Sequence, residues 1–317
     1  MPECLRTGFW PHTFDGLTLG SIYAMIALGY TMVYGVLQLI NFAHSEVFMI
    51  GTFAGVWMLR LYGIHSPVSG IELPLMIAAI MVPSMAISGA TAVALERVAY
   101  RPLRRRGAPR LAFLITAIGA SIFLSNLFFI RIPIVGWTLG GAAPVQYPEL
   151  IHRTAVFTAF GYQISNKQIL VVVTMLLMYL FLDRFVMRTR AGKALRAVAE
   201  DPEAAALMGV PIDRVIVTTF LLGGIMAGAA GSLYGLFFGQ AQFNIGFIHG
   251  IKAFTAAVLG GIGNIRGALL GGLLLGLVEN LGVTCTSTAW QDVIAFGILV
   301  AVLMFRPTGI MGERVRA

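Results

Sequence analysis

Residues 190–211 read RAGKALRAVAEDPEAAALMGVP, a polar insert between apolar runs at 169–182 and from residue 215 onward. Within it, Asp201 is a good helix N-cap, Pro202 suits the first helical position, and the charge of Glu203 suits the positive end of the helix dipole. Gly209 and Pro211 then supply a stop. The pattern predicts a helix of about two turns over residues 202–208, within a polar segment 188–214.

So short a helix needs a partner, because isolated helices shorter than about 12–15 residues are marginal in water. Its surface is formed by Ala204, Ala205, Ala206, Leu207 and Met208. We expect it to dock in a groove of a partner protein. The competing interpretation is a solvated loop that holds lipid headgroups through Arg188, Arg190, Lys193 and Arg196. That role explains the cations but not the capped apolar helix that follows them.

The composition around this insert is that of a membrane protein. Of 317 residues, 58% are hydrophobic and only 11% are charged, and the mean hydropathy is +0.85. Uncharged runs cover residues 16–37, 73–95, 111–130, 169–182, 215–247, 253–265, 267–278 and 293–305, and several reach the roughly 20 residues that span a bilayer. We expect an all-α, polytopic bundle of eight or nine membrane segments, some short or re-entrant, in a single domain over residues 1–317.

The basic residues indicate the orientation. The formal net charge is +8, but most of the 22 Lys and Arg residues fall at 96–110, at 183–214 and from 306 onward, at the edges of apolar runs. This placement argues against nucleic acid as a partner and, by the positive-inside rule, predicts that the three regions are cytoplasmic. The connection 131–167 and the N-terminus then lie outside. No cleavage site follows the first apolar run, so we expect a retained span.

The apolar pieces between 249 and 279 are too short for ordinary spans. We expect a hairpin of tilted or broken helices around residues 263–267. Gly263, Gly267 and Gly271 are four residues apart, which predicts one helix face for close packing. No GxxxxGK[ST] motif occurs, so any ATP that drives this protein is hydrolysed by another subunit.

Polar residues inside apolar runs are functional candidates, because charge in the bilayer is costly. The candidates for a translocation path are Asn41, His44, Glu46, Asn126 and Glu279. Alternatively, Asn41 caps the second span, His44 and Glu46 bond to loops at the cytoplasmic interface, and Glu279 is structural near the outer end of its segment. No catalytic triad or metal-binding motif is present, so we expect no catalytic residue, no metal site and no cofactor bound by this chain.

Two weaker patterns remain. Cys4 and Cys285 are the two cysteines, and we expect two ordinary thiols rather than a bond. Short similar motifs, GSIYA from Gly20 and GSLYG from Gly231, each precede an Asn-containing connection, which leaves a duplicated architecture open.

The sequence resembles the H-type permease subunits of Liv-type importers of branched-chain amino acids. Glu203-Ala-Ala and Gly209 match the first half of the EAA signature of binding-protein-dependent ABC permeases, whereas residues 219–222, TFLL, depart from its second half. The Liv-type matches lie at residues 15–24, 40–46, 96–102, 199–201, 252–263 and 307–310, and they cover nearly the whole chain.

The resemblance implies a heterodimer with a second permease subunit, two cytoplasmic ATPases that use ATP and Mg, and a periplasmic binding protein, in a bacterial inner membrane. Asp201, Pro202, Glu203, Ala204, Ala205, Leu207 and Gly209 would couple the chain to an ATPase. The connections 131–165 and 239–250 would receive the binding protein. Urea, short amides and other amino acids are alternative cargoes. A secondary transporter is a remote alternative, because the spans hold few carboxylates for coupling ions.

Overall fold

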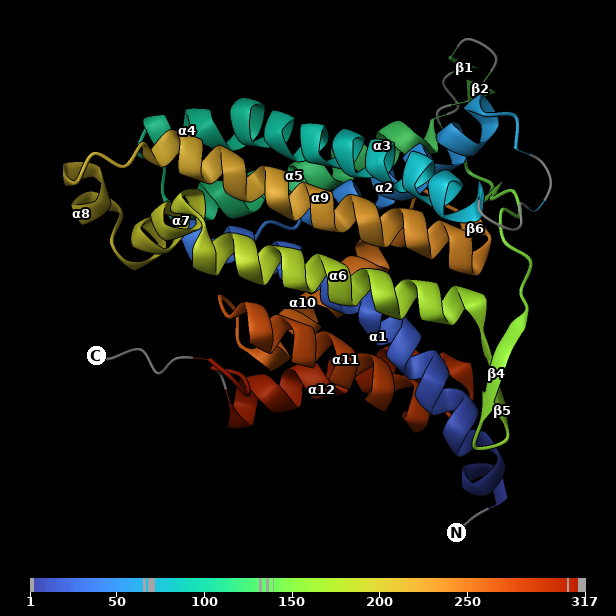
Figure 1. Cartoon of the computed structure of the whole chain (residues 1–317). Coiled ribbons are helices and arrows are strands. Elements are labelled where there is room, and N and C mark those ends of the chain that lie inside the picture. Colours follow the sequence, from blue (N-terminus) through green and yellow to red (C-terminus); the bar gives the residue numbers. More distant parts are fainter. Residues whose placement is uncertain are drawn as a thin grey trace.

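The fold is a bundle of helices in a computed structural model that describes residues 3–64, 67, 72–130, 133–134, 137–138, 140–306 and 308–312. Side chains are described outside residues 3–7, 133–134 and 137–138. The long helices run side by side, with α4, α7 and α8 at one end and most strands at the other (Figure 1). We call these the inner and the outer end.

The helices account for most of the described chain. They are α1 (Glu3–Leu37), α2 (His44–Leu61), α3 (Glu72–Leu95), a π-helical turn (Glu96–Tyr100), α4 (Arg101–Arg105), α5 (Arg110–Phe129), α6 (Asn166–Arg188), α7 (Arg190–Glu200), α8 (Pro202–Leu207), α9 (Ile212–Phe238), α10 (Ile245–Gly260), α11 (Ile265–Gly282), a 3₁₀ turn (Thr288–Trp290) and α12 (Gln291–Phe305). The predicted helical class is confirmed.

Seven helical segments of the described chain are long and apolar enough to cross a bilayer. Helix α10, with 16 residues, is shorter, and α2, with 18 residues like α11, is less apolar than these seven; both pack among them, so the bundle has the expected mixture of full and short membrane segments. The most apolar window of α1 is 94% buried and that of α9 is 78% buried, whereas that of α12 is only 6% buried. In a membrane, α1 and α9 therefore form the protein core, and α12 presents its apolar surface to lipid or to another chain.

The bundle also carries short strands that the sequence did not predict. They are β1 (Pro133–Ile134), β2 (Trp137–Thr138), β3 (Val145–Gln146), β4 (Ala155–Ala159), β5 (Tyr162–Ser165) and β6 (Gln240–Ala241). Strands β1–β2 and β4–β5 form antiparallel hairpins, and β3 pairs with β6. Residues 240–241, just before α10, pair with the outer connection, and Ala241 is fully buried.

Helices α10 and α11 form the predicted hairpin. Gly267 and Gly271 lie against the α10 backbone at Gly260 and Ala256, so close that an added Cβ atom would clash. The prediction for Gly263 is wrong, because it lies in the turn before α11, with a φ of +95° that favours glycine, and an added Cβ atom there would meet no described atom within 4 Å. A spacing of four residues between glycines does not distinguish a glycine on the helix face from one in the turn before the helix.

The cysteine expectation also needs correction. Cys285, in the connection between α11 and the 3₁₀ turn, is disulfide-bonded and is not an ordinary thiol. Cys4 is the other cysteine of the sequence, and its side chain lies outside the described ones. A bond at this outer end suits an oxidising compartment on that side of the membrane.

Candidate functional site

The polar insert forms two helices, α7 and α8, at the inner end. The Asp201 carboxylate accepts hydrogen bonds from the backbone N–H groups of Glu203 (2.9 Å) and Ala204 (3.0 Å), as the N-cap prediction requires. Helix α8 ends before Gly209, which has a φ of +81°. Helix α7, which the sequence analysis did not define, is capped in the same way by Thr189.

Helix α8 is exposed on all sides but one. Ala205 is its buried residue, whereas Leu207 is 89% exposed and Met208 just after it is 84% exposed. Large apolar side chains this exposed, on a helix too short to be stable alone, mark a surface that a partner covers. The other coupling candidates, Pro202, Glu203, Ala204 and Gly209, are exposed beside them.

Replacing Asp201 by alanine is expected to loosen α8. The change removes the acceptor of two backbone N–H groups, and loss of such a cap costs about 1 kcal/mol. Hydrogen–deuterium exchange of the purified chain should speed up roughly fivefold over residues 202–208 and stay unchanged in α9. Asp201→Asn, which keeps the acceptor, is the control. Equal exchange in the alanine variant would mean that the cap does not hold the helix.

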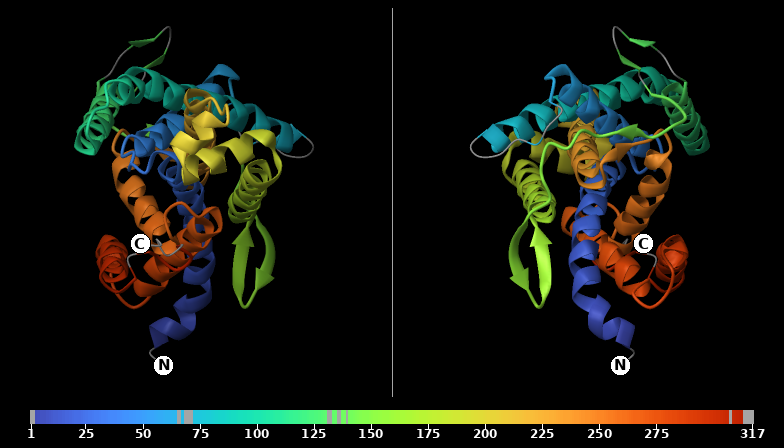
Figure 2. Two further views of the ribbon diagram at one scale, coloured as in Figure 1. Left: turned by 90° about the vertical axis from the view of Figure 1, so that its left-hand side faces the viewer. Right: turned by 90° about the vertical axis from the view of Figure 1, so that its right-hand side faces the viewer.

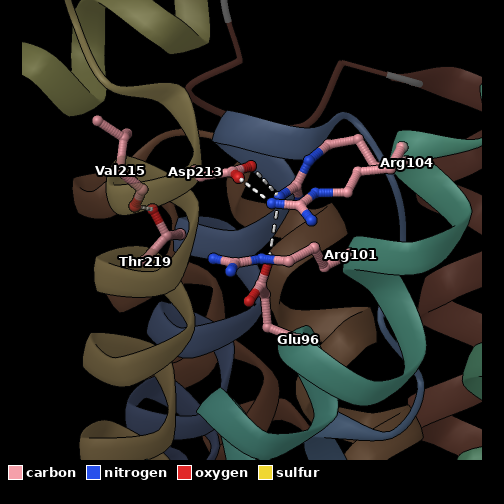
Figure 3. A network of polar contacts seen from close by, with 7 residues as sticks. Glu96, Arg101, Arg104, Asp213, Val215 and Thr219 are labelled. Carbon is pink, nitrogen blue, oxygen red and sulfur yellow. Dashed lines mark hydrogen bonds and ion pairs between the residues drawn. The ribbon is translucent and has the colours of Figure 1, made fainter.

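An ion-pair network joins the start of α9 to the π-helical turn and α4 at the inner end (Figure 3). The Arg104 guanidinium donates to Asp213 Oδ1 (2.6 Å) and to Glu96 Oε1 (3.0 Å). Arg101 also donates to Glu96 (3.4 Å), whose side chain is fully buried. Asp213 lies only a few residues after α8, so the network fixes the chain just beyond the exposed helix to α4.

The same region reaches the bundle interior through Tyr100, which ends the π-helical turn. Its hydroxyl donates to Asn41 Oδ1 (2.6 Å), in the connection between α1 and α2. The side chain of Asn41 does not cap α2, because the N-cap is Ala43 and has no side-chain bond. Hydrogen bonds and ion pairs therefore connect α9 to the residues that precede α2.

His44 and Glu46, in the first turn of α2, are each only 1% exposed. They lie inside the bundle, so the alternative that placed them at the cytoplasmic interface is wrong. Ser121 of α5 donates to Glu46 Oε1 (3.0 Å), while Glu46 Oε2 and His44 Nε2 have no partner among the described residues. The ring of His44 packs edge-on against Tyr30, with centroids 4.8 Å apart.

Glu279 belongs to a separate buried ion-pair cluster. Lys252 Nζ of α10 lies 2.5 Å from Glu279 Oε1 of α11 and 2.6 Å from Asp292 Oδ1 of α12. The Tyr23 hydroxyl of α1 also donates to Glu279. The sequence analysis missed Lys252 as a site residue, although a lone lysine in an apolar helix was a signal for a buried partner.

Asn126 does not join the other candidates. It lies exposed on α5, and its amide donates to the Ile122 carbonyl one turn earlier in the same helix (2.8 Å). The geometry therefore brings together Asn41, His44 and Glu46 around the start of α2, places Glu279 in a different cluster, and leaves Asn126 on the outer surface of the bundle.

The outer end carries the β4–β5 hairpin, which extends away from the helices beside the start of α1 (Figure 2). The Phe160 ring at its tip stacks on Trp10 of α1, with centroids 4.0 Å apart. Tyr162 donates to Asp15 of α1 (3.2 Å), and burial raises the pKa of this tyrosine above its usual value. The hairpin is thus fixed to α1 while Val156 and Phe157 remain exposed.

These features define a multi-pass permease-type membrane protein with an exposed helix at its basic end. Residues 12–303 match the family model described as "branched-chain amino acid transport system / permease component". The chain belongs to this family.

Individual relatives extend the similarity over almost the whole chain. The permease protein BraD of Pseudomonas aeruginosa, named for a high-affinity branched-chain amino acid transport system, is 45% identical, covering 99% of this chain and 98% of the relative. The similarly named LivH of Escherichia coli is 43% identical, covering 96% of each chain. A probable LivH of Methanocaldococcus jannaschii is 26% identical over 67% of this chain and 62% of the relative. No solved structure matches.

Proposed function

We propose that this chain is a permease subunit of a binding-protein-dependent ABC importer that carries leucine, isoleucine and valine across a bacterial inner membrane. The observation that carries the proposal is the capped helix α8, whose Leu207 and Met208 are almost fully exposed at the basic end of the bundle. An apolar helix in this position has the shape and chemistry to enter a groove of a cytoplasmic ATPase. The names of the full-length relatives support the cargo.

The proposed assembly adds four kinds of component to this chain. A second permease subunit would form a heterodimer with it, across one of its exposed apolar faces such as that of α12. Two ATPase subunits would bind ATP and Mg at the inner end. A periplasmic binding protein would dock on the outer connections, including the hairpin β4–β5. Hydrolysis itself would reside on the ATPases, so this chain would be a transport subunit rather than an enzyme.

The proposed mechanism is alternating access. Closure of the two ATPases on ATP would move α8, and the ion pair of Asp213 with Arg104 would carry the movement to α4. The bond between Tyr100, just before α4, and Asn41 would carry it on to the residues that precede α2. Each of these contacts joins segments far apart in the sequence, and together they would give a movement of α8 a route into the bundle.

Uptake measurements test the cargo directly. Cells that lack this chain should take up labelled leucine, isoleucine and valine much more slowly, and a plasmid copy should restore uptake. Urea and short amides are measured in parallel. Intact leucine uptake together with lost urea or amide uptake would keep the ABC permease and replace its cargo. Intact uptake of all of them would contradict the proposal.

A further inference from the structure

Two interrupted segments meet inside the bundle. The chain leaves α1, returns through residues 38–43 and starts α2, and likewise leaves α9, returns through residues 239–244 and starts α10. Helix α2 leads to the outer end, where Gly55 packs on Tyr147 of the outer connection. Helix α10 leads toward the inner end, where Ile310 of the C-terminal segment donates to Leu259. The two helices therefore start within the bundle and run in opposite directions.

The first turns of the two helices are in direct contact. An added Cβ atom on Gly246 of α10 would lie 2.5 Å from Glu46 Oε2 and 2.8 Å from the Ser45 carbonyl oxygen. One turn later, Gly250 lies against the Ser45 side chain. Because neither glycine has a side chain, the Glu46 carboxylate reaches the backbone at the N-terminus of α10.

Among the residues that the structure describes, none balances the charge of Glu46. Ser121 satisfies one oxygen, but Oε2 is buried without a hydrogen-bond partner, and no described Lys, Arg or His lies within ion-pair distance of it. The nearby buried lysine, Lys252, is occupied by Glu279 and Asp292. A carboxylate so placed is costly unless a cation or a donor joins it.

The N-terminus of α10, in turn, lacks a side-chain hydrogen-bond acceptor. Its N-cap residue, Asn244, makes no side-chain capping bond, so backbone N–H groups of the first turn are without that acceptor. The positive end of the helix dipole favours an anion at this position. One unpaired carboxylate oxygen and one uncapped helix start thus lie side by side.

We propose that Glu46 and the first turn of α10 bind the zwitterionic head of an amino acid during its passage through the membrane. The α-ammonium group would lie on Glu46 Oε2, and the α-carboxylate would accept from N–H groups at the start of α10. Glu46 is 1% exposed here, so the first turns of α2 and α10 separate to admit the ligand. This inference rests on the proposed function, since it assigns the site at which that cargo is held.

The test uses the complete complex of permeases and ATPases, purified with the wild-type chain or with Glu46→Gln. Binding of labelled leucine is measured without the binding protein, and leucine transport is measured in proteoliposomes with it. Glu46→Gln should weaken leucine binding roughly tenfold or more, the loss expected when a buried charge pair is broken. Thermal stability should not fall, because the substitution removes a buried charge that no described residue balances. Asn126→Leu, which removes an exposed polar group in the same membrane region, should change none of these.

Competition on the wild-type complex separates the two halves of the site. Leucinamide lacks the α-carboxylate and isocaproate lacks the α-ammonium group, so each should displace labelled leucine much more weakly than unlabelled leucine does. In Glu46→Gln the advantage of leucine over isocaproate should largely disappear, because the acceptor of the ammonium group is gone. The wild-type comparison decides the question even if the variant fails to fold.

The outcomes distinguish the inference from the function on which it rests. Leucine transport by the wild type together with unchanged leucine binding in Glu46→Gln, or with isocaproate competing as well as leucine does, overturns the site and leaves the function. The same holds if the transporting wild-type complex binds no leucine without its binding protein. A wild-type complex that hydrolyses ATP but transports no leucine overturns the proposed function, and the site with it.

Discussion

Replacing Leu207 by aspartate is expected to stop leucine uptake without unfolding the chain. The side chain is 89% exposed, so the substitution removes no contact within the bundle. A charge at the centre of a docked apolar surface costs 1.4 kcal/mol or more of binding, which is roughly a tenfold loss of affinity. Uptake in complemented cells should fall about tenfold or more, and the ATPase subunits should no longer copurify with the chain.

The matched control is Leu207→Met, which keeps an apolar side chain of similar volume at the same position. It should transport leucine nearly as well as the wild type. Membrane levels of both variants are compared by immunoblot, so that loss of uptake is not mistaken for loss of protein. Normal uptake and normal copurification in Leu207→Asp would show that α8 does not contact the ATPase.

Replacing Lys252 by methionine is expected to have the largest effect on stability. Lys252 Nζ lies between Glu279 and Asp292, and the Glu279 side chain is fully buried. Removing one partner of a buried ion pair leaves an uncompensated charge and typically costs about 3–5 kcal/mol. The folded yield and the midpoint of thermal unfolding of the detergent-solubilised chain should both fall markedly.

A second substitution distinguishes the cost of the orphaned charge from the loss of packing. Combining Lys252→Met with Glu279→Gln removes both charges, so the double variant should recover much of the lost stability. Thermal unfolding monitored by tryptophan fluorescence compares the single and double variants directly. A double variant that is no more stable than Lys252→Met would indicate that the cluster acts through packing rather than through charge.

Local signals in the sequence were sufficient for the long spans and for α8. Hydropathy marks a span wherever about 20 apolar residues follow one another, and the cap at Asp201 depends only on the residues that directly follow it. The pairing of Lys252 with Glu279 depends instead on how α10 folds back on α11. No feature within either helix specifies that register, so Glu279 was named as a candidate without its partner.

Polarity within a span does not reveal which face a residue occupies. Asn126 and Glu46 both interrupt apolar sequence, yet Asn126 is exposed and bonds to its own helix, whereas Glu46 is buried. The interruption at 38–43 is largely apolar, and the one at 239–244 is mixed, with Gln240, Gln242 and Asn244 among its six residues. Hydropathy therefore could not show that α2 and α10 start inside the bundle, or that their first turns meet.

Because β3 pairs with β6, only a few residues link the outer connection to the interior of the bundle. Ala241 of β6 lies opposite Val145 of β3 in the antiparallel pair, and α10 begins at Ile245. Four residues of extended chain span about 14 Å at most, so Ala241 and the start of α10 cannot move further apart than this distance. A partner that pulls the outer connection outward beyond this limit also moves the start of α10. Docking of a ligand on the outer side could therefore loosen the closed contact between helices inside the bundle.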